Sequence, residues 1–398
     1  MASVMPFSER AVERRFWWLL LAGGVALGAG LGAAFVMEHE GHIITGMNNE
    51  IVWGTPHVFA IFLIVAASGV LNVASVGSVF GQSAYKSRAR LSGLLCLAML
   101  AGGLMVLMLD LGRPERIVVA ATRYNFTSVF AWNVFLYTGM FAVVALYLWA
   151  LMEKRMNRYS KPAGVAAFIW RFVLTTGTGS IFGFLVARQA YSSALLAPLF
   201  IAMSLSWGMA VFLVAEALLN AWRGGDVDPQ LLRRMKNLLG ILVGLVLYLT
   251  AVYHMTNLYF AKQTAFEHFI LLGGGVYTQL FWGGYVLVGS VLPLVLLWRP
   301  GAQTRRAAVT AAALVIVGAF AQLYVFIIGG QAFPLEIFPG FDVTSSFRDG
   351  QIAAYAPSVP EILLGIGGVA AAYLITLVGV QVLDFMPAAE PAVGAAGK

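Results

Sequence analysis

Cysteine and charge are both scarce in this chain of 398 residues. Its single cysteine, Cys96, lies in an apolar stretch, so the chain forms no internal disulfide and holds no iron–sulfur cluster of its own, which takes about four thiolates. Only 11% of the residues are charged and 60% are hydrophobic, with a mean hydropathy of +0.83. A water-facing surface needs far more charge than this, so the sequence predicts an all-α integral membrane protein.

Apolar runs long enough to cross a bilayer, about 20 residues each, recur ten times along the sequence. The predicted spans are 17–37, 56–80, 91–110, 129–152, 165–187, 194–220, 238–260, 276–298, 307–329 and 361–383. An even number of spans places both termini on the same side of the lipid bilayer.

The distribution of lysine and arginine predicts which side that is. Eighteen of the 25 fall on the side of the termini: Arg10, Arg14, Arg15, Lys86, Arg88, Arg90, Lys154, Arg155, Arg158, Lys161, Arg223, Arg233, Arg234, Lys236, Arg299, Arg305, Arg306 and Lys398. The opposite side has Arg113, Arg116, Arg123, Arg188, Lys262 and Arg348, and Arg171 lies within a span. The positive-inside rule therefore predicts cytoplasmic termini. Because topology explains the net charge of +7, nucleic acid is not implied as a partner.

The spans divide the chain by count into two four-helix bundles, spans 2–5 and 6–9, with peripheral first and last helices. Residues 1–55 hold the cytoplasmic N-terminus, the first span and a periplasmic loop. Residues 56–190 form the first bundle, and residues 191–330 the second. Residues 331–398 hold a periplasmic loop, the last span and a cytoplasmic tail. The loop 330–360 is long enough to act as a lid or to dock a partner.

All five histidines fall on the outer side or in the outer half of a span in this topology. His57 follows Pro56 at the start of the second span, where proline is tolerated. At 100° per residue, Ser68, Asn72 and Ser75 share its helix face and form a polar stripe that faces the bundle interior or a wet cavity. Imidazole titrates near neutral pH, which suits a site where a quinol loses protons or a quinone gains them.

Further polar side chains gather at the outer ends of the third and fourth spans. Asp110 and Arg113 end the third, and Tyr124 and Asn125 precede the fourth. An acid, a guanidinium, a phenol and an amide therefore lie at the depth of His57. We predict a quinone-binding site formed by His57, Asp110, Arg113, Tyr124 and Asn125.

Other interpretations of these residues stay open at this point. His57 could make only a structural hydrogen bond, or serve with His254 as an axial ligand of a b-type haem. Asp110 could cap a helix or pair with Arg113. His39 and His42 could bind a metal, but a solvated acidic loop is the better interpretation of their surroundings.

Two charged residues lie at matching depths in neighbouring spans, Arg171 in the fifth and Glu216 in the sixth. Because a charge inside the bilayer is costly, the two could pair, or each could extend to the cytoplasmic surface. With Ser68, Asn72 and Ser75 they are candidates for a proton path. A transporter is the competing class, with Gly177–Gly179 as the best position for a broken helix.

One motif carries a family resemblance. Asp110-Leu-Gly-Arg-Pro114 at the end of a span, followed by Asn125, Ser128 and Trp132, resembles the NrfD-like family of membrane subunits typified by polysulfide reductase. Residues 47–75 (MNNEIVWGTPHVFAIFLIVAASGVLNVAS) are similar to the DsrP branch, the membrane subunit of the Dsr sulfur-metabolism complex. Asp110, Arg113 and Asn125 match the motif, and His57 matches by its location alone.

The resemblance implies a quinone-interacting subunit of a respiratory or sulfur-metabolism redox complex in the bacterial cytoplasmic membrane. It implies a bound menaquinone or ubiquinone, no haem or iron–sulfur cluster in this chain, and a periplasmic iron–sulfur subunit as electron partner. The DsrP likeness adds a multihaem cytochrome c, a haem-b membrane subunit and a cytoplasmic iron–sulfur subunit. A proton-conducting module and a passive membrane anchor are the alternatives.

Overall fold

The computed structural model describes residues 12–386, except 226, 300–303, 337, 339–340, 342–344 and 347–349. Within that part of the chain, ten helices are long and apolar enough to cross a membrane, and no strand occurs. This confirms the predicted fold class and number of spans. Arg10, Arg348, Lys398 and the predicted cytoplasmic tail from residue 387 onward lie outside the described residues.

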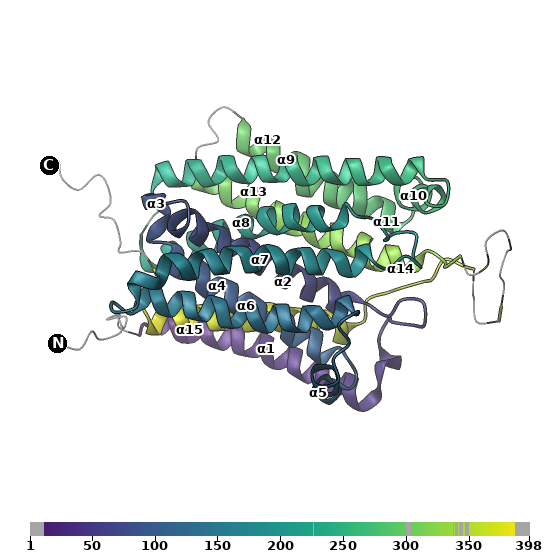
Figure 1. Ribbon diagram of the computed structural model, residues 1–398, viewed down its shortest axis with the longest axis horizontal. Helices are drawn as coiled ribbons and strands as arrows, with labels where there is room; N and C mark the ends of the chain where they lie inside the picture. Colours follow the sequence, from purple (N-terminus) through teal and green to yellow (C-terminus); the bar gives the residue numbers. More distant parts are fainter. Residues whose placement is uncertain are drawn as a thin grey trace.

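The long helices run roughly parallel to the long axis of the molecule (Figure 1). In chain order the elements are α1 (Arg14–Glu40), η1 (His42–Ile44), α2 (Thr55–Ser78), α3 (Ser83–Lys86), α4 (Ala89–Leu109), η2 (Pro114–Arg116), α5 (Ile117–Thr122), α6 (Val129–Met152), η3 (Asn157–Tyr159), α7 (Ser160–Gly183), α8 (Leu196–Arg223), α9 (Pro229–Tyr259), α10 (Thr264–Leu271), α11 (Val276–Gln279), η4 (Leu280–Val291), α12 (Leu292–Trp298), α13 (Arg305–Tyr324), η5 (Val325–Gly329), α14 (Gly330–Ala332) and α15 (Val359–Val382).

The helices contact one another in two groups joined by a central helix pair. In the first group α2 packs against α4 and α7, and α6 packs against α4 and α7. In the second, α8 packs against α9 and α13, while η4 and α12 pack against α13 and α9. Helix α2 also packs extensively against α8, which joins the groups, and it is the most buried of the ten spans. Helices α1 and α15 pack together outside the first group, with α15 against α4.

Glycine makes the contact between α2 and α8 possible. A Cβ placed on Gly69 would lie 1.5 Å from the Ser204 carbonyl oxygen, and one on Gly208 would lie 2.1 Å from the Gly69 carbonyl carbon. The two backbones therefore touch directly, as small residues allow in membrane helices. This contact fixes the position of one helix group against the other.

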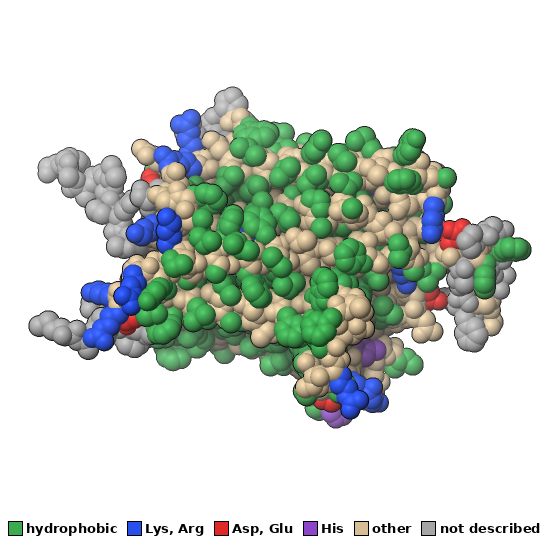
Figure 2. Space-filling view, viewed as in Figure 1, with side chains coloured by type: hydrophobic (Ala, Val, Ile, Leu, Met, Phe, Trp, Pro, Cys, Tyr) green, Lys and Arg blue, Asp and Glu red, His purple; other side chains and the backbone are tan. Residues whose placement is uncertain are grey.

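Charge marks the two ends of the molecule. We call the end where α1 begins and α15 ends the terminal end, and the opposite end, with α5, α10 and α14, the distal end (Figure 1). Lysine and arginine gather at the terminal end, and a smaller basic group lies by α5 (Figure 2). Between them the visible surface is largely hydrophobic. This pattern agrees with the charge distribution from which the sequence predicts cytoplasmic termini.

Two local expectations from the sequence are wrong. Helix α7 runs unbroken from Ser160 to Gly183, so Gly177–Gly179 is no helix break. A helical glycine costs only about 1 kcal/mol, which packing offsets: Gly179 lies directly against the α8 backbone near Leu196. The irregular helices lie elsewhere, because η4 and η5 are π-helical. The seventh span also begins earlier than predicted, at Pro229, where Asp228 caps the helix by accepting from the Gln230 amide.

Candidate functional site

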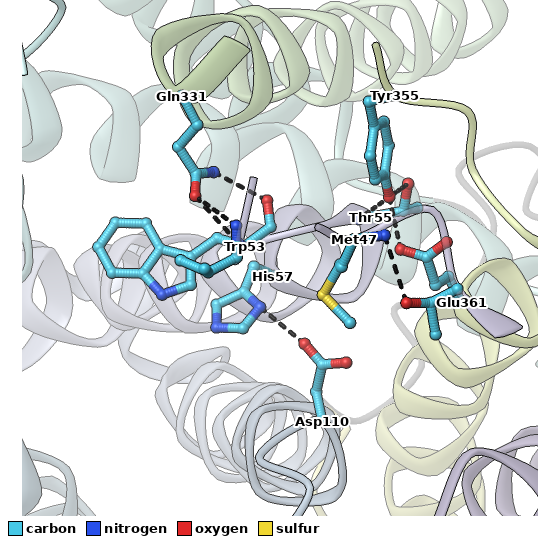
Figure 3. Close-up of polar contacts among 10 residues, drawn as sticks. Met47, Trp53, Thr55, His57, Asp110, Gln331, Tyr355 and Glu361 are labelled. Atoms are coloured by element: carbon cyan, nitrogen blue, oxygen red, sulfur yellow. Dashed lines mark hydrogen bonds and ion pairs between the residues drawn. The ribbon is translucent and has the colours of Figure 1, made fainter. Parts of the chain in front are cut away.

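A buried histidine–carboxylate pair lies at the distal end of the first helix group. His57 is the third residue of α2, and Asp110 directly follows α4. The distance from His57 Nδ1 to Asp110 Oδ2 is 2.7 Å, with side-chain exposures of 13% and 0% (Figure 3). The contact has the length of an ion pair, although its angles are not those of a hydrogen bond. The Asp110 carboxylate thus holds one ring nitrogen and leaves Nε2 as the other site for a proton or a ligand.

The other oxygen of the Asp110 carboxylate, Oδ1, lacks a hydrogen-bond partner among the described residues. The Oδ1 atom is buried and accepts no hydrogen bond from any of them. The chain turns sharply after it at Gly112, whose φ of +66° suits glycine, and a Cβ there would lie 2.9 Å from His42 Nε2. A buried acceptor without a partner is costly, so this oxygen marks a place where a ligand group or a water would bind.

The loop before α2 is held from the second helix group by Gln331 of α14. Its Oε1 accepts from the Val52 and Trp53 amides at 3.1 and 3.0 Å, and its Nε2 donates to the Trp53 carbonyl at 2.9 Å (Figure 3). The Arg188 guanidinium adds two bonds, to the carbonyls of Gln331 at 2.6 Å and Glu50 at 2.7 Å. Trp53 is thereby stacked near the His57 ring, with centroids 6.0 Å apart.

The start of α2 is also held by the beginning of α15. Glu361 is fully buried, and its carboxylate accepts from the Gly46 and Ser358 amides and from the Tyr355 hydroxyl at 2.9, 2.7 and 2.6 Å. The Tyr355 oxygen in turn accepts from the Thr55 amide at 2.6 Å (Figure 3). Burial, together with this bond to Glu361, raises the pKa of Tyr355, so its hydroxyl keeps the proton that it donates.

Three of the five predicted site residues lie outside this cluster. Arg113 is exposed, and it forms no ion pair with Asp110. Tyr124 packs edge to face against Phe126 and Phe135. Asn125 is exposed and stabilises its own turn by accepting from the Thr127 amide and hydroxyl at 3.0 and 2.8 Å. The structure therefore brings His57 and Asp110 together and places Arg113, Tyr124 and Asn125 in the loops near the end of α4.

The predicted polar stripe on α2 faces the interior of the first helix group. The Ser68 and Thr175 hydroxyls lie 2.7 Å apart, and Arg171 donates from Nη2 to Asn72 Oδ1 at 2.7 Å. The Arg171 guanidinium also lies over Phe172, 4.3 Å from the ring centroid. Ser75 instead bonds within its own helix, to the Leu71 carbonyl. These contacts link α2 to α7 near the middle of both helices.

Arg171 and Glu216 do not pair with each other. Glu216 forms a buried ion pair with Arg88, which lies just before α4, whereas Arg171 uses the Asn72 amide and aromatic faces. The sequence places Arg171 and Glu216 at the same depth, which makes a pair conceivable. Depth does not specify the direction in which a side chain points from its helix, and the two side chains point to different neighbours.

Removing one partner of the Arg88–Glu216 pair should destabilise the protein strongly. Glu216→Ala leaves a buried guanidinium without its carboxylate, at a cost of about 3–5 kcal/mol. We expect a large drop in the midpoint of thermal or detergent unfolding. A double variant, Arg88→Met with Glu216→Leu, should recover much of the loss, and equal losses in the single and double variants would contradict the assignment.

Gln331→Leu should release the loop that carries Trp53. It keeps the size of the side chain but leaves the Val52 and Trp53 amides unpaired, at about 1–3 kcal/mol each. Hydrogen–deuterium exchange of residues 50–54 should speed up while that of α4 stays unchanged. Gln279→Leu, at an exposed position of the same end, is the matched control, and protection that is equal in both variants would show that Gln331 does not hold the loop.

Sequence comparison places this architecture in a family. The family model for polysulphide reductase, NrfD, matches residues 44–335. The chain is 30% identical over 377 residues to an Hdr-like menaquinol oxidoreductase integral membrane subunit of Archaeoglobus fulgidus, covering 93% of each protein. It is 29% identical to a putative dimethyl sulfoxide reductase membrane subunit of Halobacterium salinarum, covering 95% of this chain and 93% of that one. This protein belongs to the NrfD family of membrane subunits.

Part of the site lies outside the matched region. Protein NrfD of Escherichia coli is 25% identical, and the match covers 62% of this chain and 84% of that protein. The family match ends at residue 335, so Tyr355, Glu361 and the whole of α15 lie beyond it. The sequence does contain a local signal for Glu361, because Ser358 and Glu361 have the spacing of a helix capping box, and the structure forms that box. Gln331 has no such signal.

Proposed function

We propose that this protein is the quinone/quinol-interacting membrane subunit of a redox complex, and that quinone binds at His57 and Asp110. The observation that carries the proposal is the buried pair at 2.7 Å, placed where a membrane-spanning helix meets the distal end. The name of the Archaeoglobus fulgidus relative, a menaquinol oxidoreductase subunit, supports menaquinol as the substrate. The likeness of residues 47–75 to DsrP supports a complex of sulfur metabolism.

The side chains of this site suit a ligand ring that carries hydroxyl or carbonyl groups. The free Nε2 of His57 can accept a proton from a hydroxyl or donate one to a carbonyl. The unpartnered Asp110 Oδ1 can accept from a hydroxyl or a water. The Trp53 indole, stacked near the imidazole, supplies a flat apolar surface beside these groups. Gln331 and Glu361 fix the loop and helix start that carry these side chains.

Proton transfer is the chemistry that this chain's own residues can perform. A bound quinol supplies two electrons and two protons. His57 Nε2 takes one of these protons, and the Asp110 carboxylate beside Nδ1 stabilises the resulting imidazolium. The second proton passes to water, and the two electrons pass to the redox partner. The low exposure of both side chains limits solvent screening of this charge pair, which strengthens it.

The electron partner in this proposal is an iron–sulfur subunit on the periplasmic side, facing the distal end. The other proposed partners are a multihaem cytochrome c, a haem-b membrane subunit and a cytoplasmic iron–sulfur subunit. The gathering of lysine and arginine at the terminal end (Figure 2) supports cytoplasmic termini in a bacterial cytoplasmic membrane. Reporter fusions after residues 153 and 262 test this: the first should report cytoplasm and the second periplasm, and the reverse would invert the assignment.

Extraction of the purified complex followed by mass spectrometry for quinones tests the proposal against a passive membrane anchor. We expect a quinone to copurify with the wild-type complex and to be depleted by His57→Ala. Wild-type complex without quinone, and without saturable binding of added menaquinone, would favour the anchor.

A proton path in the first helix group is a second proposal, supported by the bonds among Ser68, Arg171 and Asn72. Ser75 and Glu216 would extend it toward the terminal end. Proteoliposomes that hold the complex, a quinol and a pH probe test it: Asn72→Leu should lower the number of protons moved per electron. Quinol oxidation with no proton movement across the membrane would remove this coupled function, and substrate transport without quinol would favour a transporter.

A further inference from the structure

A second histidine–carboxylate pair lies at the distal end of the second helix group. His254 of α9 forms a hydrogen bond from Nδ1 to Glu267 Oε2 of α10 at 2.6 Å, with side-chain exposures of 14% and 0%. Asn257 donates to the other oxygen, Glu267 Oε1, at 2.7 Å. As at His57, a fully buried carboxylate holds Nδ1 of a histidine near a helix end and leaves Nε2 for another partner.

The charge of Glu267 is not neutralised by lysine or arginine, since no such side chain among the described residues forms an ion pair with it. Titratable and charged side chains toward the distal end of the surrounding elements include Arg188, Tyr191, Tyr253, Tyr259, Lys262, His268, Tyr277, Tyr285 and Tyr324. Tyr253, on the same helix as His254, lies close enough to Glu267 for the two side chains to interact electrostatically.

Two small cavities lie in the second helix group, and the larger one reaches His254 of this pair. One, of about 30 Å³, is lined by His254, Thr250 and Gln322 among apolar side chains that include Met203 and Phe281. The other, of about 10 Å³, shares Gln322 and is lined by Ser206, Tyr285 and Ser290. A buried water needs about 10–15 Å³ together with polar partners, so the larger cavity has room for water.

The side chain shared by the two cavities has an unmet hydrogen-bonding atom. Gln322 is 6% exposed, and its Oε1 has no partner among the described residues, although its Nε2 donates to the Thr250 hydroxyl at 3.3 Å. Thr250 also accepts from the Tyr285 hydroxyl at 2.9 Å, which leaves its own proton available to a neighbour. The Gln322 Oε1 acceptor and the Thr250 hydroxyl donor therefore both remain available beside the larger cavity, which can hold water.

The helices around these cavities are irregular in the same region. The π-helical segments are η4, which contains Tyr285 and Ser290, and η5, which begins three residues after Gln322. A π-helix is rare and is frequently found at functional sites. Within η4 the Ser290 hydroxyl donates to the Tyr285 carbonyl at 3.1 Å, so side-chain and backbone polar groups both lie along the wall of the smaller cavity.

We propose that the second helix group holds a hydrated proton-exchange site, in which His254 and Glu267 take up and release protons at the distal end. Waters beside Gln322 and Thr250 carry these protons toward the middle of the membrane. The site is separate from His57 and Asp110 and does not depend on whether quinone binds there.

Radiolytic hydroxyl-radical footprinting of the intact complex tests whether the larger cavity holds water. Met203 and Met209 lie on the same helix with 1% and 0% exposure, and of the two only Met203 lines the larger cavity, while neither lines the smaller one. Bound water should make Met203 oxidise several-fold faster than Met209, and Gln322→Leu should reduce that difference. Equal, slow oxidation of the two methionines in wild type would show a dry cavity and overturn the proposal.

Infrared difference spectra recorded while the pH of the medium is stepped test the proton exchange. The wild-type protein should show carboxyl or imidazole bands that shift in D₂O within the mixing time, and Glu267→Gln should abolish them. The His57→Ala variant should retain them, which separates this site from the proposed quinone site. Spectra unchanged by Glu267→Gln would overturn the proposal even where bound water is found.

Discussion

His57→Ala should lower the rate of quinol oxidation by the intact complex by about 10²- to 10⁴-fold, the usual range for loss of a general base. Asp110→Asn keeps the shape of the side chain but removes the charge beside His57 Nδ1, so we expect a smaller loss, mainly in the maximal rate. Steady-state oxidation of a water-soluble quinol with an artificial acceptor measures both.

His268→Gln is the matched control for these variants, because it removes an imidazole from an exposed position of the distal end. It should leave turnover unchanged. If His57→Ala, Asp110→Asn and His268→Gln all oxidise quinol at the wild-type rate, His57 and Asp110 take no part in the reaction.

Gly208→Leu should separate the two helix groups. Its side chain would enter the backbone of α2, since even its Cβ would lie 2.1 Å from the Gly69 carbonyl carbon. Overpacking typically costs about 1–3 kcal/mol and occasionally more, and a backbone collision belongs at the upper end. We expect a lower yield of folded protein and an unfolding midpoint well below that of wild type, measured by size-exclusion fluorescence after heating.

Gly244→Leu is the matched control, since a side chain at that position of α9 meets open space. It should unfold at the wild-type temperature. Equal stability of the two leucine variants would mean that α2 and α8 do not approach as closely as their glycines indicate.

Hydrophobicity was sufficient to predict the membrane-spanning helices, because bilayer thickness sets their length and composition. Their ends were harder to predict. The start of α9 depends on the Asp228 cap, and the π-helical segments have no recognisable pattern in the sequence. Gly69 and Gly208 were visible as glycines, but only the structure shows that they face each other.

The proposed site could be predicted from the sequence only in part. His57 and Asp110 are polar groups at the same depth, and the structure does pair them. Arg113, Tyr124 and Asn125 share that depth, yet they lie in loops, where depth does not determine contacts. Gln331 is 278 residues from Trp53 and Glu361 is 315 residues from Gly46, and no spacing rule links them to the loop that they hold.

Photo-cross-linking of the complex with an azido-menaquinone, followed by peptide mass spectrometry, tests the central claim most directly. We expect label in residues 47–60 and 105–113, which contain His57 and Asp110, and loss of that label when excess unlabelled menaquinone competes. Competable label confined to other segments, with none in these two, would contradict a quinone site at this pair.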